Sequence, residues 1–178
     1  MKEADAVPVL SGAEIVEATG GEIVRGKSGV LLSGISTDSR AVAAGNLFIP
    51  LVGEKFNGHD FLAVAVRAGA YGVLLQKSEI GRLGALPDSV TAIAVNDTLR
   101  ALGDIARFRR RMFSAPVLAI TGSSGKTTTK EMAAAIIGAQ RRLLKTEGNF
   151  NNLIGLPLTL LRLNDTHEAV ILELGTNR

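Results

Sequence analysis

Cysteine and tryptophan are missing from this chain of 178 residues, and tyrosine occurs once. Without cysteine the chain has no disulfide framework, no thiolate metal site and no thiol nucleophile, which fits a reducing compartment. Its first residues include acids and no continuous apolar segment, unlike a signal peptide, and no apolar run approaches the roughly 18 residues of a membrane span. We therefore predict a soluble, cytoplasmic protein without a membrane partner.

Basic residues outnumber acidic ones, which gives a formal net charge of +3, and the densest basic stretch is RFRRR at 107–111. Nucleic-acid-binding proteins usually interleave such cations with aromatic residues that stack on bases, and aromatic residues make up only 4% of this chain. The same arginines end an amphipathic helical pattern over 97–113, where cations suit the helix dipole. We therefore predict a helix end here and no nucleic-acid partner.

The segment TGSSGKTT at 121–128 has the composition of a phosphate-binding loop, although the usual pattern asks for a glycine where Ile120 stands. An apolar strand pattern precedes it, and an alanine-rich helical pattern begins near Lys126. A glycine loop between a strand and a helix N-terminus points backbone N–H groups at a phosphate, and a lysine adds a cation. The alternative is a serine–glycine turn with a solvated lysine. The residues of the predicted loop are Thr121, Gly122, Ser123, Ser124, Gly125, Lys126, Thr127 and Thr128.

Magnesium bound to a nucleotide needs hard oxygen ligands from the protein. Thr127 supplies a hydroxyl directly after the loop lysine, and Glu173 supplies a carboxylate at the end of the apolar strand pattern AVILE. Taken alone, this carboxylate would be interpreted as a surface acid beyond a strand end. Its combination with the loop predicts that Thr127 and Glu173 hold Mg²⁺.

Two further polar segments are candidate ligand sites. Asn149, Asn151 and Asn152 lie between a predicted strand and a helix, which places them at the same sheet edge as the loop. One asparagine would serve as a helix cap, whereas three suggest a substrate contact. The turn DSR at 38–40 suits a phosphorylated or sugar ligand and equally an ordinary turn salt bridge. Neither histidine is assigned a catalytic role, because both lie in predicted loops.

Two regions with different patterns follow one another along the chain. Residues 1–113 contain short helical patterns and at least four strand patterns, which predicts a small mixed α/β domain. Residues 114–178 contain the loop, two helical patterns and three strands, fewer than the five or more strands of a complete nucleotide-binding sheet. We therefore predict an α/β fold whose second domain is the first, truncated part of a P-loop-type, mostly parallel, doubly wound ATP-binding domain.

Local signals place several elements of the first region. Ser11, with Glu14 three residues later, has the pattern of a capping box, so a helix is expected to run from there to the two glycines at 20–21. Asp60 is expected to cap a helix over 61–70. Strands are expected at 22–26, 30–37, 46–51, 71–76 and 90–95.

Three segments, AITGSSGKTTTKEM, NFNNLIGLPLTLL and VILELGTN, resemble in order and spacing the ATP-binding domain of the Mur ligases. The stretch ISTDSRAVAAGNLFIPLVGEKFNGHDF is similar to the domain that holds the UDP end of the substrate in family members that add D-alanyl-D-alanine. Members that add lysine or diaminopimelate usually read TGTNGKTT and lack the asparagine-rich segment. The resemblance covers essentially the whole chain, and the family's shortened loop accounts for Ile120.

The resemblance implies an ATP-dependent amide ligase of peptidoglycan precursor synthesis. The carboxylate of UDP-N-acetylmuramoyl-tripeptide would attack the γ-phosphate of ATP to form an acyl phosphate, from which the amine of D-alanyl-D-alanine would displace phosphate. Lys126 would be the catalytic residue that neutralises the phosphoryl group, Thr127 and Glu173 would hold Mg²⁺, and the three asparagines would face the substrate. The residues implied to contact the uridine diphosphate are Ser36, Thr37, Asp38, Ser39, Arg40, Asn46, Leu47 and Phe48.

Two features depart from the family pattern. Many members read Asn-His where this chain has Asn177 and Arg178, so no role of that histidine is transferred. The family's other metal ligand, its adenine contacts and its C-terminal domain lie outside these residues, so we expect a part of a longer, monomeric enzyme that is inactive alone. The alternatives are a stand-alone module for a UDP-sugar-peptide or a nucleotide, the sister ligase for lysine or diaminopimelate, and another P-loop protein such as a small-molecule kinase or GTPase.

Overall fold

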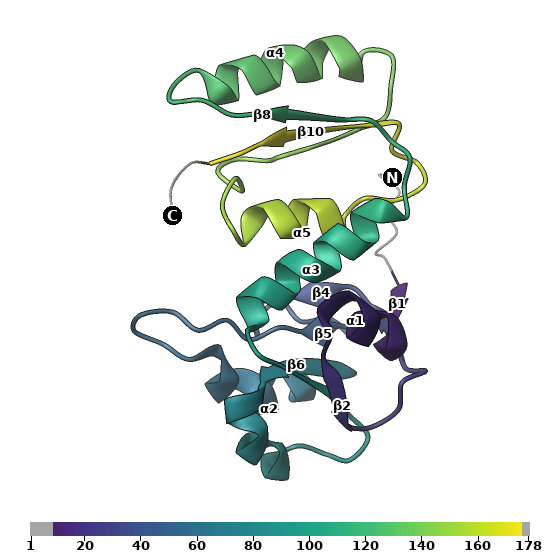
Figure 1. Ribbon diagram of the computed structural model, residues 1–178, viewed down its shortest axis with the longest axis vertical. Coiled ribbons are helices and arrows are strands. Elements are labelled where there is room, and N and C mark those ends of the chain that lie inside the picture. Colours follow the sequence, from purple (N-terminus) through teal and green to yellow (C-terminus); the bar gives the residue numbers. More distant parts are fainter. Residues whose placement is uncertain (1–8, 176–178) are drawn as a thin grey trace. The chain divides into compact units, whose positions relative to one another are not determined.

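The computed structural model describes residues 9–175, so Asn177 and Arg178 lie outside the described residues. The chain forms two compact units, Val7–Ile105 and Ala106–Arg178, whose elements are labelled in Figure 1. The division between the units falls inside helix α3 (Thr98–Arg111), whereas the domain limit expected from the sequence follows that helix. Among the described residues, no helix is both long and apolar enough to cross a membrane.

A five-stranded sheet forms the centre of the unit Val7–Ile105. Its strands, in spatial order, are β2 (Glu22–Arg25), β7 (Thr91–Val95), β6 (Gly72–Gln76), β5 (Leu47–Phe48) and β4 (Ile35–Ser36). β2 runs antiparallel to β7, and all other neighbours are parallel. The four parallel strands therefore end at one edge of the sheet, which is the edge where open α/β sheets bind ligands.

The first helix of this unit begins at the expected capping box. Ser11 donates its backbone N–H to Glu14 Oε2 at 2.7 Å, Glu14 donates its N–H to Ser11 Oγ at 3.2 Å, and helix α1 runs over Gly12–Thr19. A strand that the sequence did not predict precedes it: β1 (Val9–Ser11) pairs antiparallel with β3 (Leu31–Ser33). Three residues are too few to show the alternation of apolar and polar residues that predicts a strand. The sequence therefore predicted only the helix that begins at the capping box.

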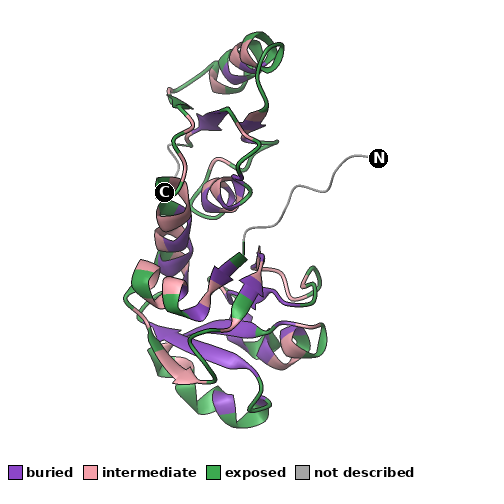
Figure 2. Cartoon of the chain, turned by 90° about the vertical axis from the view of Figure 1, so that its right-hand side faces the viewer, coloured by how far each residue is buried: buried purple, intermediate pink, exposed green. Residues whose placement is uncertain are grey.

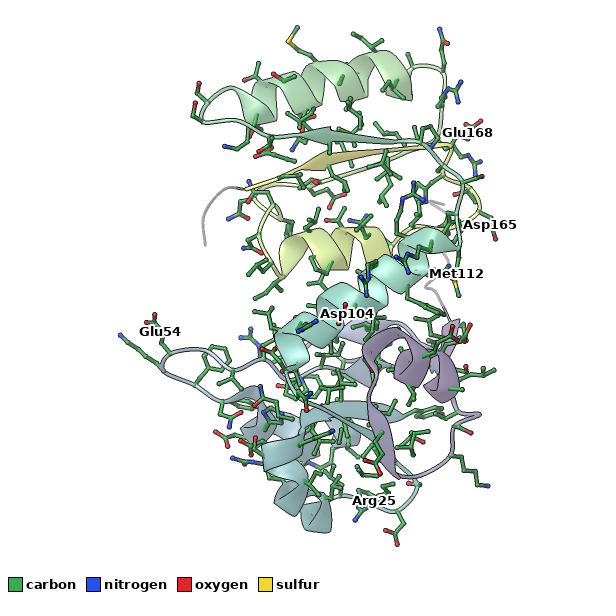
Figure 3. All side chains as sticks on the ribbon, viewed as in Figure 1. Arg25, Glu54, Asp104, Met112, Asp165 and Glu168 are labelled. Carbon is green, nitrogen blue, oxygen red and sulfur yellow. The ribbon has the colours of Figure 1, made fainter. Side chains whose placement is uncertain are left out.

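The predicted cap at Asp60 is wrong. Helix α2 (Leu62–Arg67) begins after Phe61 without a side-chain cap, because a 3₁₀ helix, η1 (Gly58–Phe61), leads into it. Asn57 caps η1, since its side-chain oxygen accepts the N–H of His59 at 3.0 Å. A second 3₁₀ helix, η2 (Lys77–Ala85), occupies the region expected to be a loop or a broken helix. Arg25, labelled in Figure 3, fastens η2 to the sheet by donating to the carbonyl oxygens of Leu83 and Leu86 at 2.8 and 2.6 Å.

The core of this unit lies on the central strands. Leu74 of β6 and Ile93 of β7 have no exposed surface, and Figure 2 shows the broad buried band along the sheet. His59 is also buried, and its Nε2 accepts the N–H of Gln76 at 3.0 Å at the end of β6. Its Nδ1 lies 2.7 Å from the side-chain oxygen of Asn57. Burial lowers the pKa of His59, so the folded state favours the neutral imidazole.

We expect acid to weaken this unit through His59. A lowered pKa in the folded state means that the stabilisation is complete above the unfolded pKa of about 6.5 and is lost as the pH falls below it. Protonated Nε2 cannot accept the N–H of Gln76, so the free energy of unfolding should fall by about 1 kcal/mol between pH 7 and pH 5. Urea titrations at both pH values measure this change. His59→Gln keeps an acceptor that does not titrate, and an equal acid loss in that variant would contradict the assignment.

The unit Ala106–Arg178 contains a three-stranded parallel sheet in the order β8 (Val117–Ile120), β10 (Ala169–Glu173), β9 (Leu143–Lys145). Figure 1 shows helix α4 (Lys126–Gly138) on one face of this sheet and helix α5 (Gly155–Leu161) on the other. Helices on both faces of a parallel sheet are the doubly wound arrangement. The predicted α/β fold is therefore confirmed.

The basic stretch at 107–111 ends helix α3, as expected. Arg109 donates to the carbonyl oxygen of Leu163 at 3.3 Å, and its guanidinium lies 4.6 Å from the ring centre of Phe113. Arg110 donates to the carbonyl oxygen of Ala115 at 2.8 Å. These arginines thus bind the chain's own backbone where α3 leads into β8.

Candidate functional site

The glycine loop connects the end of β8 to the start of α4. Gly122 and Gly125 have φ angles of 151° and 72°, the region that side chains other than glycine rarely adopt. Gly125 is the N-terminal cap residue of α4, and a Cβ built on it meets no atom within 4 Å. Backbone conformation, rather than crowding, therefore requires glycine here.

Lys126 is the first residue of α4 and folds back over the loop. Its Nζ donates to the carbonyl oxygen of Gly122 at 2.7 Å. The N–H groups in the first turn of a helix have no partner within the helix, and they carry the positive end of its dipole. The loop thus brings a side-chain cation and unpartnered donors to one place, which is the requirement for binding a phosphate.

Glu173 lies beside this loop because β10 pairs with β8. Their register sets Glu173 opposite Ile120, the last residue before the loop, and the carboxylate is buried, at 3% exposure. One oxygen, Oε2, accepts the hydroxyl of Thr127 at 3.0 Å, and the other, Oε1, accepts Nδ2 of Asn151 at 2.8 Å. The predicted pair Thr127 and Glu173, 46 residues apart in sequence, is thus in direct contact.

A lysine that the sequence reasoning missed completes this cluster. Lys130 is 1% exposed, and its Nζ lies 3.6 Å from Glu173 Oε2 and 3.2 Å from Glu131 Oε1. Burial alone would raise the pKa of Glu173, but the hydrogen bonds from Asn151 and Thr127 and the charge of Lys130 lower it below its ordinary value. The carboxylate is therefore held in its anionic form.

The oxygen atoms around Glu173 fit a nucleotide-bound magnesium ion. A hydroxyl and a carboxylate are hard ligands, and Mg²⁺ usually takes only one or two protein groups together with phosphate oxygens and water. Within residues 9–175, no group of three or more His, Cys, Asp or Glu side chains could hold a metal by itself. Thr127 and Glu173 thus offer the partial ligand set that a metal–phosphate complex needs.

The three asparagines have different surroundings. The side chain of Asn151 is engaged with Glu173, and its carbonyl oxygen accepts the N–H of Gly175 at 2.7 Å. The side-chain oxygen of Asn152 accepts the N–H groups of Ile154 and Gly155 at 3.0 and 2.8 Å, so it acts as a cap for the start of α5. Asn149 is exposed, and its carbonyl oxygen accepts the N–H of Asn151 at 2.8 Å. Asn149 therefore has the side chain best placed to meet a ligand.

The second candidate site lies after β4 in the other unit. Asp38 and Arg40 form a two-pronged ion pair with an Nη2–Oδ2 distance of 2.7 Å, and the Arg40 side chain is 87% exposed. The hydrogen bonds from Arg40 lower the pKa of Asp38 to about 2. Ser36 donates its hydroxyl to the carbonyl oxygen of Asp38 at 2.8 Å and so fixes the turn that also carries Thr37 and Ser39. The exposed guanidinium thus projects from a rigid turn at the carboxyl edge of the sheet.

The segment Asn46–Phe48 supports this turn from the neighbouring strand. Asn46 is 9% exposed and uses both ends of its amide, accepting the N–H of Ala43 at 2.9 Å and donating to the carbonyl oxygen of Ser33. Leu47 and Phe48 are core residues at 0% and 1% exposure. Their buried side chains fix the position of β5, and their contact with the uridine diphosphate stays a prediction.

A strand, a glycine loop, a helix that starts at a Lys-Thr pair and an acid on the adjacent strand are the parts of P-loop-type nucleotide-binding α/β proteins. The family model described as "Mur ligase family, catalytic domain" matches residues 31–110, and the model "Mur ligase middle domain" matches residues 120–178. The chain therefore belongs to the Mur ligase family.

Two similar curated proteins carry the same name. UDP-N-acetylmuramoyl-tripeptide–D-alanyl-D-alanine ligase from Bacillus subtilis is 43% identical over 145 residues, which cover 82% of this chain and 31% of that protein. The ligase of the same name from Escherichia coli is 40% identical over 148 residues, which cover 83% of this chain and 31% of that protein. The chain thus spans about a third of the length of the curated relatives that it matches.

Solved structures show the same relationship. A crystal structure of MurF from Acinetobacter baumannii superposes with a TM-score of 0.85 at 33% identity, covering 96% of this chain and 37% of that one. A MurF ligase from Thermotoga maritima in complex with ADP gives a TM-score of 0.68 at 34% identity, covering 78% and 31%. A UDP-N-acetylmuramoyl-L-alanyl-D-glutamate–2,6-diaminopimelate ligase reaches 0.62 at 21% identity, covering 94% and 36%, which is a likeness of fold alone.

Proposed function

We propose that this chain supplies the UDP-substrate-binding domain and the first part of the ATP-binding domain of a ligase that adds D-alanyl-D-alanine to UDP-N-acetylmuramoyl-tripeptide. The observation that carries the proposal is the contact between Thr127, the first hydroxyl after the loop lysine, and the buried carboxylate of Glu173. The names of the relatives at 40% and 43% identity support the choice of substrates. The ligase for diaminopimelate, at 21% identity, has no such support.

The proposed reaction has two steps. A carboxylate oxygen of the tripeptide attacks the γ-phosphorus of ATP, the bond from that phosphorus to the β,γ-bridging oxygen breaks, and ADP leaves. The amine nitrogen of D-alanyl-D-alanine then attacks the carbonyl carbon of the acyl phosphate, phosphate leaves, and the nitrogen loses a proton. The product is the new amide.

Lys126, Thr127, Glu173 and two of the asparagines have proposed roles in the first step. Lys126 and the loop N–H groups neutralise the charge that spreads over the phosphoryl oxygens. Thr127 and Glu173 would hold Mg²⁺, which when bound supplies positive charge to the phosphate oxygens. Asn151 keeps the carboxylate of Glu173 turned toward Thr127, and exposed Asn149 is proposed to meet the peptide substrate.

The proposal assigns the diphosphate of the UDP-linked substrate to the turn after β4. A guanidinium in a fixed turn can bind phosphate oxygens in pairs, and Arg40 is the exposed cation of that turn. The proposal includes a monomeric, cytoplasmic protein. It includes no nucleic-acid partner, because Arg109 and Arg110 already donate hydrogen bonds to backbone carbonyl oxygens.

Isothermal titration with UDP-N-acetylmuramoyl-tripeptide tests this assignment. We expect binding to the wild-type chain and a loss of about tenfold or more in affinity for Arg40→Ala, because a charge-assisted contact to phosphate is removed. Arg67→Ala, an exposed arginine at the end of α2, is the matched control and should bind normally. If a folded sample binds neither this ligand nor UDP, or if Arg40→Ala binds like the wild type, the assignment of the turn is wrong.

A further inference from the structure

Lys130 has the least exposed charged side chain in the loop cluster, and the proposed reaction gives it no role. It projects from α4 one turn after Lys126, and its ammonium lies between Glu131 Oε1 at 3.2 Å and Glu173 Oε2 at 3.6 Å. A buried ammonium is costly unless acids compensate it, and these two carboxylates do so. Lys130 therefore already holds a position next to the proposed metal ligand.

The four side chains that ion pairs connect around Glu173 carry no net charge. Glu131 pairs with Lys145 as well as with Lys130, so two carboxylates face two ammonium groups. Only Glu173 and Lys130 are buried, whereas Glu131 and Lys145 are 49% and 36% exposed and are screened by water. A divalent cation that approached Glu173 without a nucleotide would add two positive charges beside a carboxylate whose charge a buried ammonium already compensates.

We propose that Lys130 is the resident counter-cation of Glu173, and that it prevents a free divalent cation from binding there until nucleotide phosphates bring compensating negative charge. Lys130 thus makes the metal enter together with the nucleotide. The inference rests on the metal role of Glu173 in the proposed function.

Two contacts keep the geometry of Glu173 independent of Lys130. Asn151 holds Oε1 at 2.8 Å, and Thr127 holds Oε2 at 3.0 Å. Lys130 is farther from the carboxylate than either, at 3.6 Å, so its influence is electrostatic. Loss of its charge should therefore raise the affinity for a free divalent cation, because repulsion disappears while the ligand stays in place.

Titration with Mn²⁺ alone, followed by the electron paramagnetic resonance signal of the free ion, tests this inference on the chain without nucleotide. Lys130→Met and Lys130→Gln should each bind Mn²⁺ about tenfold more tightly than the wild type. Lys145→Met removes an exposed charge that does not touch Glu173 and should give a much smaller gain. In the double variant Lys130→Met/Glu173→Gln the gain should disappear.

The outcomes separate this inference from the proposed function. Equal or weaker Mn²⁺ binding by both neutral variants would overturn the role of Lys130 as a competing cation. Loss of folding in both variants, seen by circular dichroism, would also overturn it and assign Lys130 to stability. A gain that survives in the double variant would place the additional ion away from Glu173, for example at Glu131, and would overturn this inference while leaving the proposed function standing.

Discussion

Gly155→Ala is expected to lower the free energy of unfolding of the unit Ala106–Arg178 by about 3 kcal/mol. Gly155 is the first residue of α5, and a Cβ built on it would lie 2.4 Å from Cα and 2.7 Å from the carbonyl carbon of Phe150. These are backbone atoms, so no side-chain rotation relieves the overlap. The segment that contains Asn151 must move, and its hydrogen bond to Glu173 should weaken with it.

Gly138→Ala is the matched control for this substitution. Gly138 ends helix α4 in the same unit, and a Cβ there has only Leu143 Cδ2 nearby, at 3.9 Å. Alanine also favours the helix over glycine, so this variant should be as stable as the wild type or up to about 1 kcal/mol more stable. Urea unfolding followed by circular dichroism measures both changes. If Gly155→Ala unfolds at the wild-type urea concentration, the close approach of α5 to the asparagine segment is wrong.

Local sequence patterns were sufficient to predict the nucleotide half of the fold. An apolar strand, two glycines and a Lys-Thr pair at a helix start leave few alternatives for residues 115–138, and the structure confirms the strand and helix there. Glu173 could be paired with Thr127 because parallel strands end at one edge of a sheet. This expectation needs only the direction in which the two strands run, so the 46 residues between Thr127 and Glu173 did not affect it.

Other features of the site depend on three-dimensional packing that no local pattern records. Lys130 is one of two lysines in α4, and the contact of α4 with β10 buries it beside Glu173. The hydroxyl repeat before it, TTT, gave no signal for a buried cation. The 3₁₀ helix η1 was missed because a four-residue helix is too short to show a periodic pattern, so the helix start was expected at Asp60 rather than at Asn57.

Lys126→Ala is the second substitution for which we expect a large effect. The lysine is the loop's only cation that reaches Gly122, at 2.7 Å from its carbonyl oxygen, and a charge-assisted bond to phosphate contributes about 1.5–3 kcal/mol. Its removal should weaken the binding of Mg·ATP by about tenfold to a hundredfold. Arg141→Ala is the control, because Arg141 is an exposed cation three residues after the end of the same helix.

The most direct test of the central claim, that residues 121–128 hold the phosphates of ATP beside Glu173, is the phosphorus NMR spectrum of Mg·ATP with increasing amounts of the chain. This measurement detects binding even at millimolar dissociation constants. We predict that the β- and γ-phosphorus signals broaden with the wild type and with Arg141→Ala, and stay sharp with Lys126→Ala. Sharp signals with the folded wild type, or equal broadening with Lys126→Ala, would contradict the claim.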